Sequence, residues 1–153
     1  MKNILLIYTG GTIGMIQKKN SLNPFDFDNL KNAIPEIKDC GSDVHHISLE
    51  NPIDSSNMNI KYWVSLSNCI YNHYDRYDGF VILHGSDTMA YTASMLSFMF
   101  ENVNKAIILT GSQLPIGIKR SDAKENLITS IEIASSGIIN EVCIYFEYQL
   151  FRG

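Results

Sequence analysis

Three polar stretches of the sequence carry the residue types that could do chemistry on a small ligand. They are Gly10-Gly11-Thr12, Asp54-Ser55-Ser56 and Ser86-Asp87. Carboxylates bind ammonium groups, whereas hydroxyls and backbone N–H groups bind carboxylates. The paired glycines lack a Cβ, so the backbone there can turn sharply and approach a ligand closely. Together these stretches favour a site for a small zwitterion, with the Thr12 hydroxyl next to it.

A nucleotide is a poor match for the same stretches. The first turn, Gly10-Gly11-Thr12-Ile13-Gly14, departs from the GxGxxG pattern, and no GxxxxGK[ST] phosphate loop occurs. The net charge of −4, from 12 basic and 16 acidic residues, argues against nucleic acid or an anionic membrane as a partner. No apolar stretch is as long as a membrane span. We therefore expect a small-molecule substrate.

The cysteines bear on the cell compartment in which the protein functions. The sequence has three of them, an odd number, and they are widely spaced at Cys40, Cys69 and Cys143. This pattern predicts neither a disulfide framework nor a cysteine metal site, and it favours free thiols in a reducing compartment. We expect a cytoplasmic protein with no metal and no cofactor.

Apolar runs alternate along the chain with segments of helical periodicity. Strands are predicted at 4–8, 44–49, 80–83, 106–109 and 141–146, and those at 4–8 and 80–83 are predicted to be buried. Helices are predicted at 28–34, 60–74, 88–100 and 121–134, with loops at 9–25 and 50–57. The second of these helices has Asn57 or Asn59 as a candidate cap, and its Tyr71 and Tyr74 are predicted to pack against the core.

This alternation predicts an α/β fold, namely a mostly parallel, doubly wound sheet of the flavodoxin-like type with helices on both faces. Such sheets bind ligands in loops beyond the carboxyl ends of their strands. The rule selects four loops, which are residues 9–16, 52–57, 84–88 and 110–114. Because the three polar stretches lie in these loops, we expect their side chains to converge on one pocket at one edge of the sheet.

Two long motifs resemble the signatures of the asparaginase/glutaminase family, in particular its type I L-asparaginases. They are Thr9-Gly10-Gly11-Thr12-Ile13-Gly14 and His84-Gly85-Ser86-Asp87-Thr88-Met89. Shorter motifs extend the similarity in matching order, namely Thr110-Gly111-Ser112-Gln113, Arg120-Ser121-Asp122 and Phe151-Arg152-Gly153. The resemblance covers residues 1–153 and implies an asparaginase N-terminal domain that is incomplete at its C-terminal end. The family's smaller C-terminal domain is expected to be absent.

The resemblance implies an amidohydrolase that converts L-asparagine and water to L-aspartate and ammonia through a threonine acyl-enzyme. L-Glutamine is a second candidate substrate, and the full-length form is expected to be a homodimer or homotetramer. By position, Thr12 would be the nucleophile, and Ser86 would replace the family's second threonine. Asp87 would bind the substrate's α-amino group.

Further substrate contacts are implied by position in the same way. The loop that holds the α-carboxylate and amino end of the substrate is matched by Asp54, Ser55 and Ser56. Ser112 matches a backbone position near the leaving amide. His84 is expected to support the site through hydrogen bonds, because the family does not use it as the general base.

Three departures from the family's pattern bear on activity. Ser86 retains the hydroxyl of the usual threonine but lacks its methyl group. Leu22 falls where the family has a lid tyrosine, and Gly153 ends the chain shortly before the family's activating lysine. A threonine hydroxyl is a weak nucleophile that needs a partner to remove its proton. We therefore expect little or no activity from this chain alone.

Two other functions stay open on the sequence. A non-catalytic module that binds an amino acid or a protein partner would suit the missing tyrosine and lysine. A subunit of a tRNA-dependent amidotransferase shares the two signatures, but it carries an additional N-terminal domain, whereas here the first signature begins at Thr9.

Overall fold

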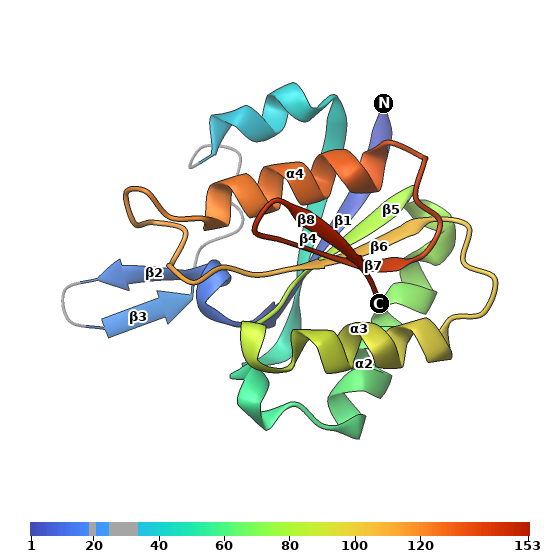
Figure 1. Cartoon of the computed structure of the whole chain (residues 1–153), viewed down its shortest axis with the longest axis horizontal. Helices are drawn as coiled ribbons and strands as arrows, with labels where there is room; N and C mark the ends of the chain where they lie inside the picture. The colour runs from blue at the N-terminus through green and yellow to red at the C-terminus, as the bar shows by residue number, and fades with distance from the viewer. Residues whose placement is uncertain (19–20, 25–33) are drawn as a thin grey trace.

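Six strands form one sheet at the centre of the computed structural model, which describes residues 1–18, 21–24 and 34–153 (Figure 1). Their order across the sheet is β4-β1-β5-β6-β7-β8. The strands are β1 (Lys2–Gly10), β4 (Ser42–Ile53), β5 (Gly79–Leu83), β6 (Ala106–Thr110), β7 (Val142–Phe146) and β8 (Gln149–Arg152). The first five are parallel, and β8 is antiparallel to β7. The predicted mostly parallel α/β fold is confirmed.

Strand β1 is buried on both faces, as its continuous apolar run predicted. Ile4, Leu6 and Tyr8 belong to the core on one face of the sheet. Leu5 and Ile7 belong to the core on the other face. Successive strand residues point to opposite faces, so a strand covered on both sides must be apolar at every position.

Helices cover both faces of this sheet (Figure 1). One face carries α2 (Ile60–His73) and α3 (Met89–Met99), whose buried residues Leu66, Ile70, Ala93 and Leu96 fill one core. The opposite face carries α4 (Ala123–Ser135) and the 3-10 helix η3 (Pro35–Cys40). Helix α2 begins after Asn59, whose side-chain oxygen accepts a 3.0 Å hydrogen bond from the Lys61 N–H. Of the two candidate caps, Asn59 is therefore the one used.

The prediction of one long loop over residues 9–25 is wrong. A 3-10 turn, η1 (Thr12–Gly14), is followed by a small antiparallel hairpin of β2 (Met15–Lys18) and β3 (Ser21–Pro24). Within the described part of the chain these strands pair only with each other, and they project from the main sheet (Figure 1). Ile16 of this hairpin packs against the core. A two-stranded ribbon outside the main sheet still needs no regular apolar alternation, so the sequence carried no strand signal there.

Two other boundaries differ from the prediction. Strand β4 continues through residues 50–53, which were predicted as loop, because Gly10 of β1 pairs with Ile53 after a shift in register. Strand β8 was not predicted. It follows β7 through a two-residue turn, Glu147-Tyr148, in which both residues have positive φ (47° and 63°). Neither residue is one that favours this conformation, so the turn had no sequence signature.

The helix predicted at 28–34 lies almost wholly outside the described residues. Within them, Pro35 opens η3, where the prediction placed it just after a helix end. A proline is well tolerated in the first turn of a helix because no intrahelical partner is needed for a backbone N–H there.

The two tyrosines near the end of the predicted helix over residues 60–74 differ in their environments. Tyr71 lies on α2, whereas Tyr74 begins the 3-10 helix that follows it, η5 (Tyr74–Arg76). Tyr74 stacks on Phe80 with ring centroids 5.9 Å apart, and Tyr77 lies beside the same ring. Tyr71 is 75% exposed, so the prediction that it packs against the core is wrong. The buried face of α2 is centred on Leu66 and Ile70, and the residue after Ile70 is rotated by about 100° away from it.

Candidate functional site

A cavity of about 450 Å³ lies beyond the carboxyl ends of β1, β4 and β5. Five of the predicted site residues line it, and they are Thr12, Asp54, Ser55, Ser86 and Asp87. The expected convergence of the three polar stretches on one pocket is therefore confirmed. Their individual chemical roles are a separate question.

The three stretches share one local structure. In each, a strand ends and a single 3-10 turn begins, at Thr12 in η1, Ser55 in η4 (Ser55–Asn57) and Ser86 in η6 (Ser86–Thr88). The first residue of each turn is thus a hydroxyl residue next to a strand end. This arrangement places three hydroxyl residues around one cavity although their sequence positions are far apart.

Glycines allow the three loops to approach one another backbone to backbone. A Cβ on Gly10 would lie 1.9 Å from the Ile53 carbonyl oxygen, and one on Gly11 would lie 2.5 Å from the Gly85 nitrogen. A Cβ on Gly85 would lie 2.4 Å from Ser55 Oγ. Gly10 and Gly11 also have positive φ values (130° and 85°), which side chains strongly disfavour. No larger residue can stand at these positions without moving the walls of the cavity.

Hydrogen bonds hold the loop that contains Asp54 and Ser55. Asp54 accepts hydrogen bonds from the backbone N–H of Ser56 (2.9 Å) and from its hydroxyl (2.8 Å). These bonds, the backbone one first, lower the pKa of the Asp54 carboxyl. The Thr88 hydroxyl donates to the Ser55 carbonyl oxygen over 2.7 Å, which ties this loop to η6. Asp54 is therefore a fixed, ionised carboxylate at the cavity wall.

Two predicted site residues do not line this cavity. Ser56 is exposed, and its hydroxyl is bonded to Asp54. Ser112 is buried, and its hydroxyl donates to the Leu114 carbonyl oxygen over 2.6 Å. The neighbouring Gly111 carbonyl accepts a buried hydrogen bond from Asn126 Nδ2 (2.9 Å). The roles predicted for Ser56 and Ser112 thus have no direct support from the cavity's geometry.

Tyr8 also lines the cavity, and sequence reasoning missed it. Its position in a buried strand predicted a core residue. The ring lies under Gly14, where an added Cβ would come within 2.1 Å of it, and burial raises the pKa of the phenol. The Tyr8 hydroxyl donates a long bond (3.4 Å) to the Gly11 carbonyl oxygen. In the sequence, the only indication that Tyr8 lines the cavity is its place two residues before Gly10, near the carboxyl end of the predicted strand.

The charge of the cavity is negative. Its carboxylates are Asp54 and Asp87, and among the described residues no lysine, arginine or histidine lines it. The described part of the chain also contains no cluster of three or more His, Cys, Asp or Glu residues that could hold a metal ion. Such a cavity suits an ammonium group, with hydroxyls and turn N–H groups available for polar or anionic groups.

His84 lies behind the cavity. It is fully buried, and its ring nitrogens lie within hydrogen-bond distance of the Gly85 carbonyl oxygen (2.6 Å) and of Thr92 Oγ1 (2.9 Å). Burial lowers the pKa of the imidazole. The predicted hydrogen-bonded support role fits this geometry.

Comparison with known proteins identifies the family. Residues 3–153 match the family described as "Asparaginase, N-terminal". The chain belongs to the asparaginase family. It is 44% identical to L-asparaginase 1 of Escherichia coli (strain K12) over 155 aligned positions, which cover 99% of the chain and 46% of that protein.

Two further relatives show the range of proteins that contain this domain. The 60 kDa lysophospholipase of Homo sapiens is 40% identical over 175 aligned positions, covering 99% of the chain and 30% of that protein. The crystal structure of L-asparaginase I from Vibrio cholerae superimposes with a TM-score of 0.90 at 42% identity, covering 99% of the chain and 46% of that structure. The asparaginase-family chain thus spans less than half the length of these relatives and corresponds to their asparaginase N-terminal domain.

Proposed function

We propose that this asparaginase-family domain supplies the nucleophile for hydrolysis of L-asparagine to L-aspartate and ammonia. The observation that carries the proposal is the common cavity of Thr12, Ser86 and Asp87. The identity to L-asparaginase 1 supports the choice of substrate, and L-glutamine is the second candidate substrate.

The proposed reaction has two steps. The Thr12 hydroxyl attacks the side-chain amide carbon, its proton passes to the departing nitrogen, and ammonia leaves an ester on Thr12. Water then attacks the ester, so that L-aspartate leaves and the Thr12 hydroxyl is restored. Ser86 is assigned to the activation of water or of the nucleophile.

Charge complementarity supports the assignment of the binding residues. The Asp87 carboxylate is assigned to the substrate ammonium group, and Asp54 lies on the same cavity. Ser55 with its neighbouring turn is assigned to the α-carboxylate, together with Ser56, and Ser112 to the region of the leaving amide. No metal or cofactor takes part in the proposed reaction.

The domain by itself is expected to turn over slowly or not at all. Its cavity is lined by no lysine or histidine in the described part of the chain, so a strong base for Thr12 is missing there. We propose that further residues of the complete protein supply it. The complete protein is proposed to be a cytoplasmic homodimer or homotetramer, which fits the three free cysteines and the exposed apolar residues of α2 and α3.

Ligand binding and ammonia release test this proposal together. We expect calorimetry to detect L-aspartate binding, and Asp87→Asn to weaken it about 10- to 100-fold, because a hydrogen bond to a charged group contributes about 1.5–3 kcal/mol. Asp75→Asn, an exposed aspartate outside the cavity lining, is the matched control. Absence of binding to the wild-type chain contradicts the proposal.

The same base-poor cavity favours a second candidate, a non-catalytic amino-acid-binding module. The two functions differ in the complete protein, where the enzyme releases ammonia from L-asparagine and the module does not. Thr12→Val should abolish that release, while Thr12→Ser should retain part of it. Full ammonia release by Thr12→Val would exclude Thr12 as the nucleophile.

A further inference from the structure

A chain of hydrogen bonds links helix α2 to the backbone behind the cavity. Trp63 Nε1 on α2 donates to Thr92 Oγ1 on α3 over 2.9 Å. Thr92 Oγ1 lies 2.9 Å from His84 Nε2, and His84 Nδ1 lies 2.6 Å from the Gly85 carbonyl oxygen. His84 and Thr92 have no exposed surface. Water therefore does not compete for the bond between His84 and Thr92, and the bonds at the two ends of the chain are part-buried.

Each atom of the chain has one consistent role. A carbonyl oxygen can only accept, so His84 Nδ1 must carry a hydrogen and donate it to Gly85. Burial disfavours the charged imidazole, so Nε2 has no hydrogen and accepts one from the Thr92 hydroxyl. The remaining lone pair of Thr92 Oγ1 accepts the indole N–H of Trp63. The four groups thus form a directed series from α2 to the Gly85 peptide.

The end of this series is the point where the cavity loops meet. Gly85 packs against Gly11 on one side and against Ser55 on the other, closely enough that neither Gly11 nor Gly85 tolerates a Cβ. The next two residues along the chain are Ser86 and Asp87, both of which line the cavity. A rotation of the Gly85 peptide would therefore displace the loop that carries both side chains.

We propose that His84 is a positioning residue, which Thr92 and Trp63 hold as the uncharged Nδ1–H tautomer, and which fixes Ser86 and Asp87 in the cavity through the Gly85 carbonyl. His84 touches no ligand in this arrangement. The inference deepens the proposed function and depends on it only for the identity of the ligand.

NMR of the 153-residue chain tests the tautomer and the positioning separately. The ¹⁵N shifts of His84 should show a protonated Nδ1 and an unprotonated Nε2 in the wild-type chain. Thr92→Val removes the hydroxyl at nearly constant volume, so it should disturb this pattern and shift the backbone amide signals of Ser86 and Asp87. Thr92→Ser keeps the hydroxyl and should restore both. The chain has one tryptophan, so its indole N–H gives a single signal, which should lose its hydrogen-bonded shift in Thr92→Val.

Ser130→Ala is the matched control for general destabilisation. Ser130 is also a fully buried helix residue, and its hydroxyl donates to the Asn126 carbonyl oxygen over 2.6 Å. This variant should leave the His84, Ser86 and Asp87 signals unchanged. If Thr92→Val does not fold, Trp63→Phe takes its place, and it should shift the Ser86 and Asp87 amides more than Ser130→Ala does. Unshifted Ser86 and Asp87 amides in Trp63→Phe would then overturn the proposal.

The proposal would be overturned by an Nε2–H tautomer in the wild-type chain, by unshifted Ser86 and Asp87 amides in Thr92→Val, or by equal shifts in Ser130→Ala. L-Aspartate titration then separates this inference from the proposed function. Thr92→Val should weaken binding about tenfold, which corresponds to about 1.4 kcal/mol, and equal affinity in Thr92→Val and the wild type would also overturn the positioning role. If the wild type shows the expected tautomer and amide shifts but binds no L-aspartate, the proposed function fails and the positioning role stands.

Discussion

Gly85 is the residue at which the geometry of the cavity is most constrained. An added methyl group would lie 2.4 Å from Ser55 Oγ and 2.7 Å from its Cβ, which is well inside van der Waals contact. Gly85→Ala must therefore push the Ser55 loop away from β5. We expect a loss of about 1–3 kcal/mol in the free energy of unfolding, the usual cost of overpacking, and loss of L-aspartate binding.

Gly117→Ala provides the comparison for that variant. The nearest atom to its added methyl group would be Cγ2 of the Ile16 side chain, at 3.3 Å. Chemical denaturation should show a change of less than about 1 kcal/mol, and calorimetry should show unchanged L-aspartate affinity. Equal losses of stability and affinity in Gly85→Ala and Gly117→Ala would mean that the close contact between Gly85 and Ser55 does not limit the geometry of the cavity.

The buried His84 makes stability depend on pH in a defined direction. Burial lowers its pKa in the folded chain, while the unfolded chain keeps the ordinary value of about 6.5. Below that pH the unfolded state binds more protons, so this group stabilises the fold at neutral pH, and its contribution is lost as the pH falls. The slope for one proton is at most about 1.4 kcal/mol per pH unit.

Urea denaturation at pH 7.5 and 5.5 measures this slope. The wild-type chain should lose stability on acidification, and His84→Gln should lose less, because glutamine does not titrate. A wild-type chain whose His84 imidazole titrates at pH 6.5 or above by NMR would contradict the assignment.

At the scale of elements, the sequence predicted the parts of the fold that the core dictates. The strand over residues 4–8 and the strands at 80–83 and 106–109 were recognised because burial on both faces requires a continuous apolar run. Their glycine- and hydroxyl-rich exits located the cavity, since the carboxyl ends of parallel strands share one edge of the sheet.

The elements that were missed lie where the core does not dictate the sequence. The β2–β3 hairpin pairs with no strand of the main sheet, and β8 has all four of its residues exposed. Tyr8 was missed as a cavity residue because its ring belongs both to a core and to the cavity wall. Sequence patterns report burial and cannot separate these two environments.

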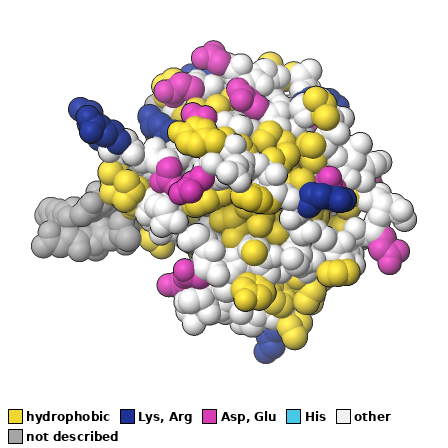
Figure 2. All heavy atoms as spheres, in the orientation of Figure 1, with side chains coloured by type: hydrophobic (Ala, Val, Ile, Leu, Met, Phe, Trp, Pro, Cys, Tyr) yellow, Lys and Arg dark blue, Asp and Glu magenta, His cyan; other side chains and the backbone are white. Residues whose placement is uncertain are grey.

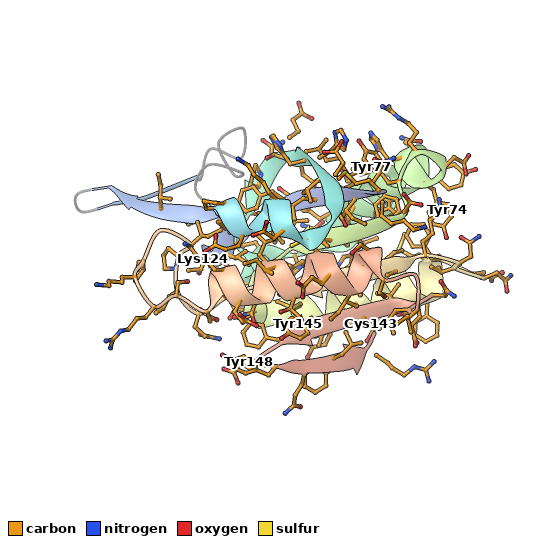
Figure 3. All side chains as sticks on the ribbon, turned by 90° about the horizontal axis from the view of Figure 1, so that it is seen from above. Tyr74, Tyr77, Lys124, Cys143, Tyr145 and Tyr148 are labelled. Carbon is orange, nitrogen blue, oxygen red and sulfur yellow. The ribbon has the colours of Figure 1, made fainter. Side chains whose placement is uncertain are left out.

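The β7–β8 turn is an element whose sequence can be improved. Glu147 and Tyr148 hold positive φ in a two-residue hairpin, and Tyr148 projects into solvent with 80% of its surface exposed (Figure 3). Asparagine followed by glycine suits this turn, because both tolerate the left-handed conformation. The double variant Glu147→Asn, Tyr148→Gly should gain about 1 kcal/mol and raise the Tm by about 2–4 °C.

Glu147→Ala is the control for the turn variant. Alanine removes the carboxylate but keeps the strain of a Cβ at positive φ, so a thermal melt should show no gain. A gain of the same size in Glu147→Ala would mean that charge and not backbone conformation limits this turn.

At the scale of the whole molecule, many large apolar side chains are exposed to solvent. No helix in the described part of the chain is long and apolar enough to cross a membrane. Hydrophobic side chains nevertheless form patches on the surface (Figure 2). The most exposed on α2 and α3 are Phe98 (85%), Tyr71 (75%), Tyr91 (68%) and Ile60 (67%). Large exposed apolar areas promote association.

We therefore expect the 153-residue chain to associate as its concentration rises, as measured by light scattering after size exclusion. Phe98→Glu should shift the chain towards monomer because it replaces the most exposed of these rings with a charge. Ser94→Glu, an exposed position on the same helix, adds the same charge without removing apolar surface and should have less effect. A monodisperse wild-type monomer with a cooperative melt at all concentrations would contradict this expectation.

The indole of Trp63 also gives the molecule an optical reporter. It is the only tryptophan in the sequence, and two side chains connect it to the Gly85 peptide. Light absorbed selectively by tryptophan is therefore re-emitted from a single place, close to the loops that surround the cavity. We therefore expect intrinsic emission to respond to ligand titrations in this protein without an attached dye.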